Sequence, residues 1–179
     1  MVDVIDLLTA RIRDVPDFPK AGIVFKDITP LLADPETLAG AVDTLAERVA
    51  PLRPDIVLGA ESRGFILGPA LAIRLGVGFA IARKPGKLPW NTVTASYALE
   101  YGEDSLELHD DAIASGMRVL VHDDLLATGG TARATCDLAE AIGGTVVGCA
   151  FLIELAFLGG RDRLAPFPVE SLISYSSEA

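Results

Sequence analysis

Two adjacent carboxylates followed by a loop of small residues carry the clearest chemical signal in the sequence. Asp123 and Asp124 end an apolar run, and they are followed by Leu125-Leu126 and then by Ala127-Thr128-Gly129-Gly130-Thr131. Small residues that open a helix let backbone N–H groups close on a phosphate, and threonine hydroxyls add donors. Carboxylates repel phosphate, but one sugar away they can accept hydrogen bonds from ribose hydroxyls or help to hold a hydrated Mg²⁺. The segment therefore predicts a site for a phosphorylated sugar.

Two other common phosphate loops are missing from the chain. It contains neither Gly-x-x-x-x-Gly-Lys-Ser/Thr nor Gly-x-Gly-x-x-Gly, the signatures of P-loop and dinucleotide-binding proteins. A purely structural turn at Gly129-Gly130 would leave the neighbouring acidic pair unexplained. The order of apolar strand, Asp-Asp, two apolar residues and Ala-Thr-Gly-Gly-Thr resembles the signature for 5-phosphoribosyl 1-diphosphate (PRPP) in type I phosphoribosyltransferases.

Further segments narrow this resemblance to the adenine phosphoribosyltransferases, over essentially the whole chain. They are residues 18–30, 61–65, 83–89, 96–102 and 164–166. The resemblance implies transfer of the phosphoribosyl group from PRPP to adenine, giving AMP and pyrophosphate. It also implies a homodimer, and Mg²⁺ held mainly by PRPP and water with no direct protein ligand. Two alternatives stay open: another purine as acceptor (hypoxanthine, guanine or xanthine), and a PRPP-binding regulator without catalysis.

A basic loop and a basic excursion are the candidates for binding pyrophosphate. Arg63 can present two donors to phosphate oxygens, and Gly64 permits close backbone approach. The resemblance implies an unusual cis peptide near Glu61–Ser62. The residues that it assigns to pyrophosphate are Glu61, Ser62, Arg63, Gly64, Arg83, Lys84 and Lys87.

The resemblance assigns binding of the purine base to residues of the N-terminal arm and of the lid. Phe25 can stack on a purine while the backbone at Val24 and Lys26 reads its amino edge, with Leu125 as the opposite wall. Without the resemblance, an apolar residue such as Phe25 would more often belong to the core. The resemblance makes Glu100, together with Arg63, catalytic: burial under a closed lid would raise the pKa of Glu100 toward proton exchange with the purine. Lys26 stands where the family often has Arg.

The elements that must position these residues alternate between helices and apolar strands. Asp34-Pro35 is typical of a helix start. Strands are expected at about 55–59, 78–82, 118–122 and 145–153, and helices at about 65–75 and 131–142. This order predicts one α/β domain over residues 1–179 with a central, mostly parallel sheet and flanking helices. The resemblance implies that residues 1–34 form an arm and base-binding hood, whose Pro-rich part, 14–30, is expected to be ordered without helix. Residues 83–109 are expected to form a long flexible lid loop.

Charge and composition exclude several partners. The chain of 179 residues has 25 acidic and 15 basic side chains, a net charge of −10. This charge disfavours nucleic acid and anionic membranes. Residues 62–99 hold five bases and no acid, which predicts one focused positive pocket. Cys136 and Cys149 are expected to be buried thiols of a cytoplasmic protein. His122 is expected to face away from the ligand, and Trp90 has no assigned role.

Overall fold

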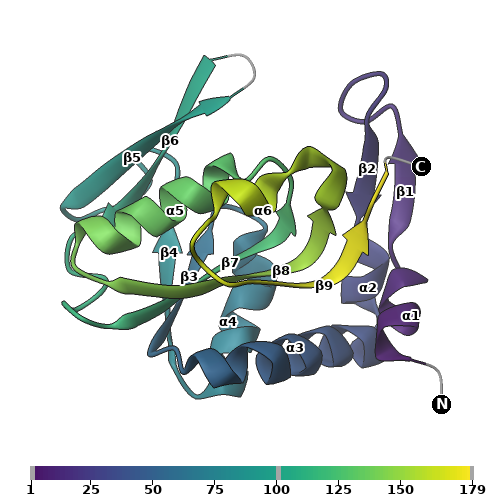
Figure 1. Ribbon diagram of the computed structural model, residues 1–179, viewed down its shortest axis with the longest axis horizontal. Helices are drawn as coiled ribbons and strands as arrows, with labels where there is room; N and C mark the ends of the chain where they lie inside the picture. Colours follow the sequence, from purple (N-terminus) through teal and green to yellow (C-terminus); the bar gives the residue numbers. More distant parts are fainter. Residues whose placement is uncertain (1–2, 100–101, 178–179) are drawn as a thin grey trace.

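A five-stranded parallel sheet forms the centre of the molecule. The computed structural model describes residues 3–99 and 102–177. The strand order is β4 (Gly78–Ala82), β3 (Ile56–Ala60), β7 (Arg118–Leu126), β8 (Thr145–Leu155) and β9 (Val169–Tyr175). Parallel strands need crossover connections, and helices supply most of them here. The mostly parallel α/β sheet expected from the sequence is confirmed (Figure 1).

Helices cover both faces of this sheet, as Figure 1 shows. α3 (Pro35–Val49) and α4 (Gly64–Leu75) lie on one face, and α5 (Gly130–Ala141) with the short α6 (Gly160–Arg163) lies on the other. Side chains of β7 alternate between two buried clusters: Val119 and Val121 pack on the α5 side, and Leu120 packs on the α3–α4 side. A strand buried on both faces must be apolar throughout, which explains the continuous apolar run.

The helix boundaries follow the local signals closely. The carboxylate of Asp34 accepts hydrogen bonds from the amides of Glu36 and Thr37, 3.0 and 3.1 Å long, and α3 begins at Pro35.

β7 differs from the expectation, because it continues four residues beyond position 122, to Leu126, and so includes both carboxylates. The reason is tertiary: β8 extends to Leu155 and pairs with β7 as far as Leu126.

The N-terminal arm is a hairpin flanked by two short helices. The elements are α1 (Val4–Thr9), β1 (Arg13–Pro16), β2 (Val24–Asp27) and α2 (Thr29–Ala33). α1 and β9 were not expected from the sequence, and α2 begins inside the segment expected to lack helix. The side chain of Lys26 is only 3% exposed: its Nζ lies 2.7 Å from Asp14 Oδ1 and 4.2 Å from the ring centroid of Tyr175. These contacts join the hairpin to the end of β9.

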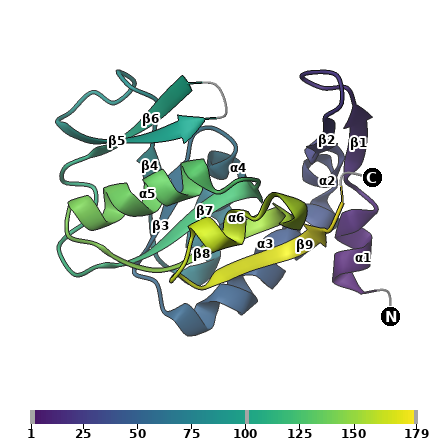
Figure 2. The same cartoon turned by 45° about the horizontal axis from the view of Figure 1, so that its top comes forward.

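The excursion between β4 and β7 is a second hairpin, β5 (Thr92–Leu99) and β6 (Gly102–His109). Figure 2 shows the two hairpins at opposite ends of the sheet. Leu106 and Leu108 of β6 are fully buried in the cluster under α5, so one side of this hairpin belongs to the core. Its closure as a lid stays a prediction.

The two cysteines lie in the core. Cys136 and Cys149 are both buried and free, with their Sγ atoms 3.6 Å apart, which confirms two buried thiols.

The remaining helical elements of the described residues are two 3₁₀ turns, which cover Ala50–Leu52 and Ala156–Leu158. Within residues 3–99 and 102–177, none of the helices combines the length and apolar character needed to cross a membrane.

Candidate active site

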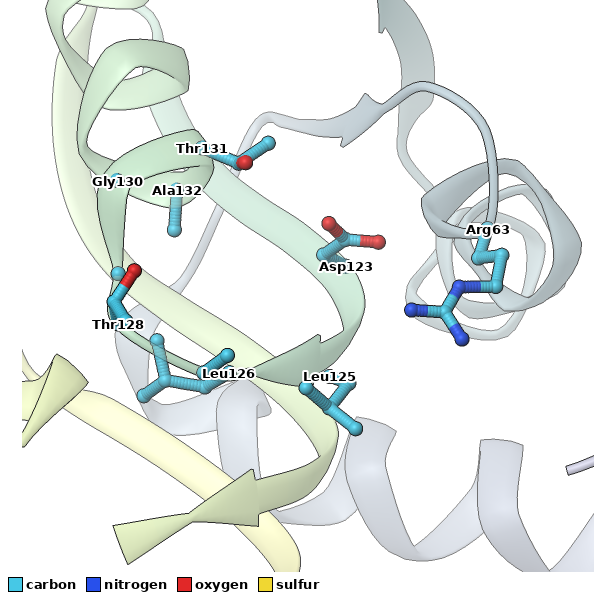
Figure 3. A pocket seen from close by; sticks show the side chains of 10 residues that line it. Arg63, Asp123, Leu125, Leu126, Thr128, Gly130, Thr131 and Ala132 are labelled. Atoms are coloured by element: carbon cyan, nitrogen blue, oxygen red, sulfur yellow. The ribbon is translucent and has the colours of Figure 1, made fainter. Parts of the chain in front are cut away.

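A pocket opens at the carboxyl end of β7, where the phosphate loop, the acidic pair and Arg63 meet (Figure 3). In parallel α/β sheets this edge is where ligands bind. Arg63 faces Asp123 across the pocket, and Thr128 and Thr131 stand on the far side. The lining residues are Arg63, Asp123, Leu125, Leu126, Ala127, Thr128, Gly129, Gly130, Thr131 and Ala132. The structure thus brings together eight residues that the sequence singled out, and adds Leu126 and Ala132.

The glycine-rich loop is held by its backbone conformation and by its neighbour. Gly129 has φ +80° and precedes the first residue of α5. A Cβ atom at Gly129 would lie 2.6 Å from the carbonyl oxygen of Gly160, and a Cβ at Gly160 would lie 2.2 Å from that of Ala127. The loop and the start of α6 therefore interlock without room for a side chain. The N-terminal amides of α5 are left at the pocket, where they favour an anion.

The two carboxylates have different surroundings. Asp123 lines the pocket, and its Oδ1 accepts a 2.8 Å hydrogen bond from the amide of Asp124. Asp124 is buried: its Oδ2 lies 3.2 Å from Nε of Arg63 but accepts no well-formed hydrogen bond. Burial and the charge of Asp124 raise the pKa of Asp123; burial also raises the pKa of Asp124, and Arg63 opposes this. A cation or hydroxyl donors would satisfy this pair.

Arg63 connects the acidic pair with the N-terminal hairpin. Its guanidinium carbon lies 5.2 Å from the ring centroid of Phe25, a cation–π distance. A Cβ atom at Gly64 would lie 2.8 Å from the carbonyl oxygen of His122, so glycine lets the start of α4 approach β7. The cis peptide implied between Glu61 and Ser62 is present.

The basic residues of the excursion are all paired with carboxylates. Glu61 contacts Arg83 and Lys87, and Lys84 forms an ion pair with Asp104. The five bases of residues 62–99, which predict one focused positive pocket, are each paired with a carboxylate in the structure. The charge count did not show this pairing, because the partner acids lie outside residues 62–99. Glu61 and Asp104 lie just beyond the ends of this range, and Asp124 lies further along the chain.

Comparisons with known proteins agree with this geometry. Residues 30–166 match the family model of the phosphoribosyl transferase domain. An adenine phosphoribosyltransferase from Rubrobacter xylanophilus is 58% identical over 176 residues, which are 98% of this chain and 95% of the relative. The chain belongs to the adenine phosphoribosyltransferase family.

Solved structures place the fold in the same family. The crystal structure of adenine phosphoribosyltransferase from Thermoanaerobacter pseudethanolicus has a TM-score of 0.94 and 48% identity, covering 96% of this chain and 99% of that one. The Saccharomyces cerevisiae enzyme, complexed with D-2,5-dideoxy-2,5-imino-altritol 1,6-bisphosphate and adenine, has a TM-score of 0.90 and 38% identity, covering 96% and 99%.

The residues assigned to adenine lie in two places in this phosphoribosyltransferase. Val24, Phe25 and Lys26 are on β2, and Leu125 lines the pocket. Phe25 also makes an edge contact with Phe18, with ring centroids 5.1 Å apart. The buried contacts of the Lys26 ammonium hold the hairpin, so only the backbone of this residue is left for a base. Glu100, the catalytic residue expected on the lid, lies outside the described residues.

The structure explains His122 by its buried position but does not explain Trp90. Nδ1 of His122 lies 3.0 Å from the carbonyl oxygen of Ala150, and the ring approaches Gly68 of α4. Burial lowers the pKa of His122 to about 4, so the ring is neutral near pH 7. It is not among the residues lining the pocket, as expected. Trp90 is 64% exposed, and nothing in the structure explains its presence.

Acid should weaken the folded state through Glu61. Burial alone would raise the pKa of this carboxyl, but hydrogen bonds from Lys87, the Lys84 amide and Arg83 outweigh it and lower the pKa from 4.5 to about 2. A lowered pKa stabilises the fold above pH 4.5, and this contribution is lost as the pH falls from 4.5 toward 2. We expect the free energy of unfolding, measured by urea denaturation, to fall less steeply over that range in Glu61→Gln. Parallel slopes for the variant and the wild type would contradict the assignment.

Proposed function

We propose that the pocket beside β7 is where this enzyme transfers the 5-phosphoribosyl group of PRPP to adenine, forming AMP and pyrophosphate. The observation that carries the proposal is one pocket lined by a phosphate loop, by Asp123 and by Arg63. In this proposal the ribose 5-phosphate lies with its phosphate on the Ala127–Thr131 loop and its hydroxyls at the acidic pair. The complex reported for the yeast relative, with adenine and a bisphosphate, fits this proposal.

Each group has a distinct part in the proposed reaction. The bond from C1 of the ribose to pyrophosphate lengthens, the sugar gains oxocarbenium character, and a nitrogen of adenine approaches the opposite face. The protein positions the reactants and stabilises charge. Backbone amides of the loop and Thr128 and Thr131 hold the 5′-phosphate, and Asp123 and Asp124 accept from the ribose hydroxyls. Arg63 stabilises the leaving pyrophosphate together with the loop at Ser62–Gly64, Arg83, Lys84 and Lys87. Glu100 keeps its proposed role in proton exchange with the purine.

Mg²⁺ is proposed to enter with PRPP. Among the described residues, no group of three or more His, Cys, Asp or Glu side chains is placed to hold a metal ion. The unsatisfied Oδ2 of Asp124 and the neighbouring Asp123 fit contact with a hydrated cation. Held by PRPP and water, the ion would supply charge neutralisation on the leaving group. We propose a cytoplasmic enzyme that needs neither nucleic acid nor a membrane.

A panel of purine bases tests the proposed reaction. Initial rates with PRPP and Mg²⁺ are measured for adenine, hypoxanthine, guanine and xanthine. We expect kcat/KM for adenine to exceed the others by at least about 100-fold, because the other three bases carry a 6-oxo group in place of the 6-amino group and a site built to hydrogen-bond that donor rejects them. A preference for guanine would contradict the adenine assignment. PRPP binding by calorimetry without turnover of any base would indicate a regulator instead.

A homodimer is proposed through the outer face of α3 and α4. Ile73 is 81% exposed at an apolar groove between these helices, and Ile66 stands two turns before it on α4. An exposed apolar patch of this kind is typical of a protein–protein interface. A symmetric pair of copies would bury the same groove on both. The groove is lined by Pro35, Leu38, Ala39, Val42, Asp43, Ala70, Ile73 and Arg74.

Ile73→Glu should dissociate this dimer. Burying an unpaired carboxylate costs several kcal/mol, so we expect the dimer dissociation constant to rise at least about 10-fold. Light scattering over a range of protein concentrations measures the mass. Trp90→Glu, which places the same charge at another exposed apolar site, should stay dimeric. An Ile73→Glu protein with unchanged mass would show that the copies meet elsewhere.

A further inference from the structure

Glu61 occupies an unusual place for a carboxylate near a site for pyrophosphate. It follows β3 directly, and its side chain is only 10% exposed. Oε1 accepts a 2.6 Å hydrogen bond from Nζ of Lys87. Oε2 accepts from the backbone amide of Lys84 at 2.8 Å and from Nε of Arg83 at 3.3 Å. Both oxygens are therefore directed at the cationic segment 83–87.

The same segment is fixed through its backbone by a second acid. Glu107 of β6 pairs with Arg83 through two backbone hydrogen bonds, of 2.9 and 2.7 Å, and its Oε2 accepts from the amide of Gly86 at 2.9 Å. Nη1 of Arg83 also donates to the carbonyl oxygen of Lys87 at 3.3 Å. Glu107 thus fixes the course of the chain. The directions of the Arg83 and Lys87 side chains are set by Glu61.

Charge decides what this side chain can do. A carboxylate cannot serve as a ligand of pyrophosphate, because both are anionic and would repel each other. It can bring two cations together, since its charge offsets their mutual repulsion, and it orients them by directional hydrogen bonds. Glu61 is two residues from Arg63, which lines the pocket. The gathered cations therefore lie next to the loop that carries Arg63.

We propose that Glu61 is a positioning residue for PRPP: its carboxylate holds Arg83 and Lys87 in place for the pyrophosphate group and does not bind that group itself. The inference rests on the proposed function, and it replaces the assignment of the Glu61 side chain as a pyrophosphate ligand. The loop at Ser62–Gly64 keeps its proposed contact with pyrophosphate. Binding of a preorganised cation pair avoids the cost of ordering two long side chains.

The test compares Glu61→Gln and Glu61→Asp with the wild type, with Glu140→Gln as the control. Glu140 contacts Arg133 at 3.6 Å on α5, so the control removes the same charge from another ion pair. We expect Glu61→Gln to raise KM for PRPP at least about 10-fold and the inhibition constant of pyrophosphate by a similar factor. KM for adenine should change less than about 2-fold. Glu61→Asp keeps the charge on a shorter side chain and should raise KM for PRPP about 3-fold.

A spectroscopic measurement accompanies the kinetics. Trp90 is the only tryptophan of the sequence and follows Lys87 by three residues. Its fluorescence anisotropy should fall in Glu61→Gln, because the segment loses the hydrogen bonds of Glu61 and keeps only those of Glu107, and should keep the wild-type value in Glu140→Gln. Thermal unfolding followed by circular dichroism verifies that each variant is folded.

The outcomes separate this inference from the proposed function. A wild-type enzyme that does not convert adenine and PRPP would refute the function. An active wild type whose KM for PRPP is unchanged in Glu61→Gln, or falls, would overturn the positioning role. A fall would mean that the carboxylate competes with pyrophosphate. If Glu61→Gln does not fold, Glu61→Asp decides: a KM for PRPP equal to that of the wild type overturns the inference.

Discussion

Gly129→Ala is expected to lower kcat/KM for PRPP by at least about 100-fold. Gly129 has φ +80°, which costs a residue with a Cβ about 1–2 kcal/mol. The added Cβ would also lie 2.6 Å from the carbonyl oxygen of Gly160. Backbone cannot yield as a flexible side chain does, so the loop must move away from α6. The amides that it presents to the 5′-phosphate move with it, and small displacements at such a site cost about 100-fold in rate.

Gly116→Ala provides a matched control for this prediction. Gly116 has φ +82°, but a Cβ there would meet nothing within 4 Å. It should share the loss of stability from the strained backbone, about 1 kcal/mol, and keep the wild-type kcat/KM. Steady-state kinetics and urea denaturation of both variants separate strain from misplacement of the loop. Equal kinetic losses in the two variants would show that the phosphate loop is not the cause.

Asp124→Asn is expected to reduce kcat/KM for PRPP about 10- to 100-fold. Oδ2 of Asp124 is buried next to Arg63 and accepts no well-formed hydrogen bond, which leaves it open to a donor such as a ribose hydroxyl. A hydrogen bond to a charged group contributes about 1.5–3 kcal/mol, which corresponds to this range. Asparagine removes the charge that faces Arg63 and adds an NH₂ donor. Both changes act on PRPP rather than on the purine.

Separate titrations of the two substrates check the assignment. KM for adenine should stay within about 3-fold of the wild type in Asp124→Asn. Asp137→Asn is the control, since Asp137 pairs with Arg133 on an exposed face of α5, and it should not affect either substrate. Equal losses for PRPP and adenine would show that the ribose assignment is wrong.

Local chemistry in the sequence was sufficient to predict the framework. Asp34 and Pro35 determine where α3 begins, because a capping side chain and a fixed φ act within a few residues. The apolar runs of β3 and β8 indicate burial on both faces, and the structure confirms it. The β1–β2 hairpin and β9 were missed, since their stability depends on distant partners: Lys26 contacts Tyr175, about 150 residues further along the chain.

For the candidate site, too, some features were predictable from the sequence and others were not. The sequence by itself determined the chemical types and their order, because the phosphate loop, the acidic pair and Arg63 lie at or after the carboxyl ends of strands, and these ends must meet at one sheet edge. Only the tertiary structure decided which charges face each other. Glu61 and Asp104 lie just outside a window of five bases without acids, yet both contact cations from that window. Coulomb interaction depends on distance in space and not along the chain, so the ion pairs follow from the fold.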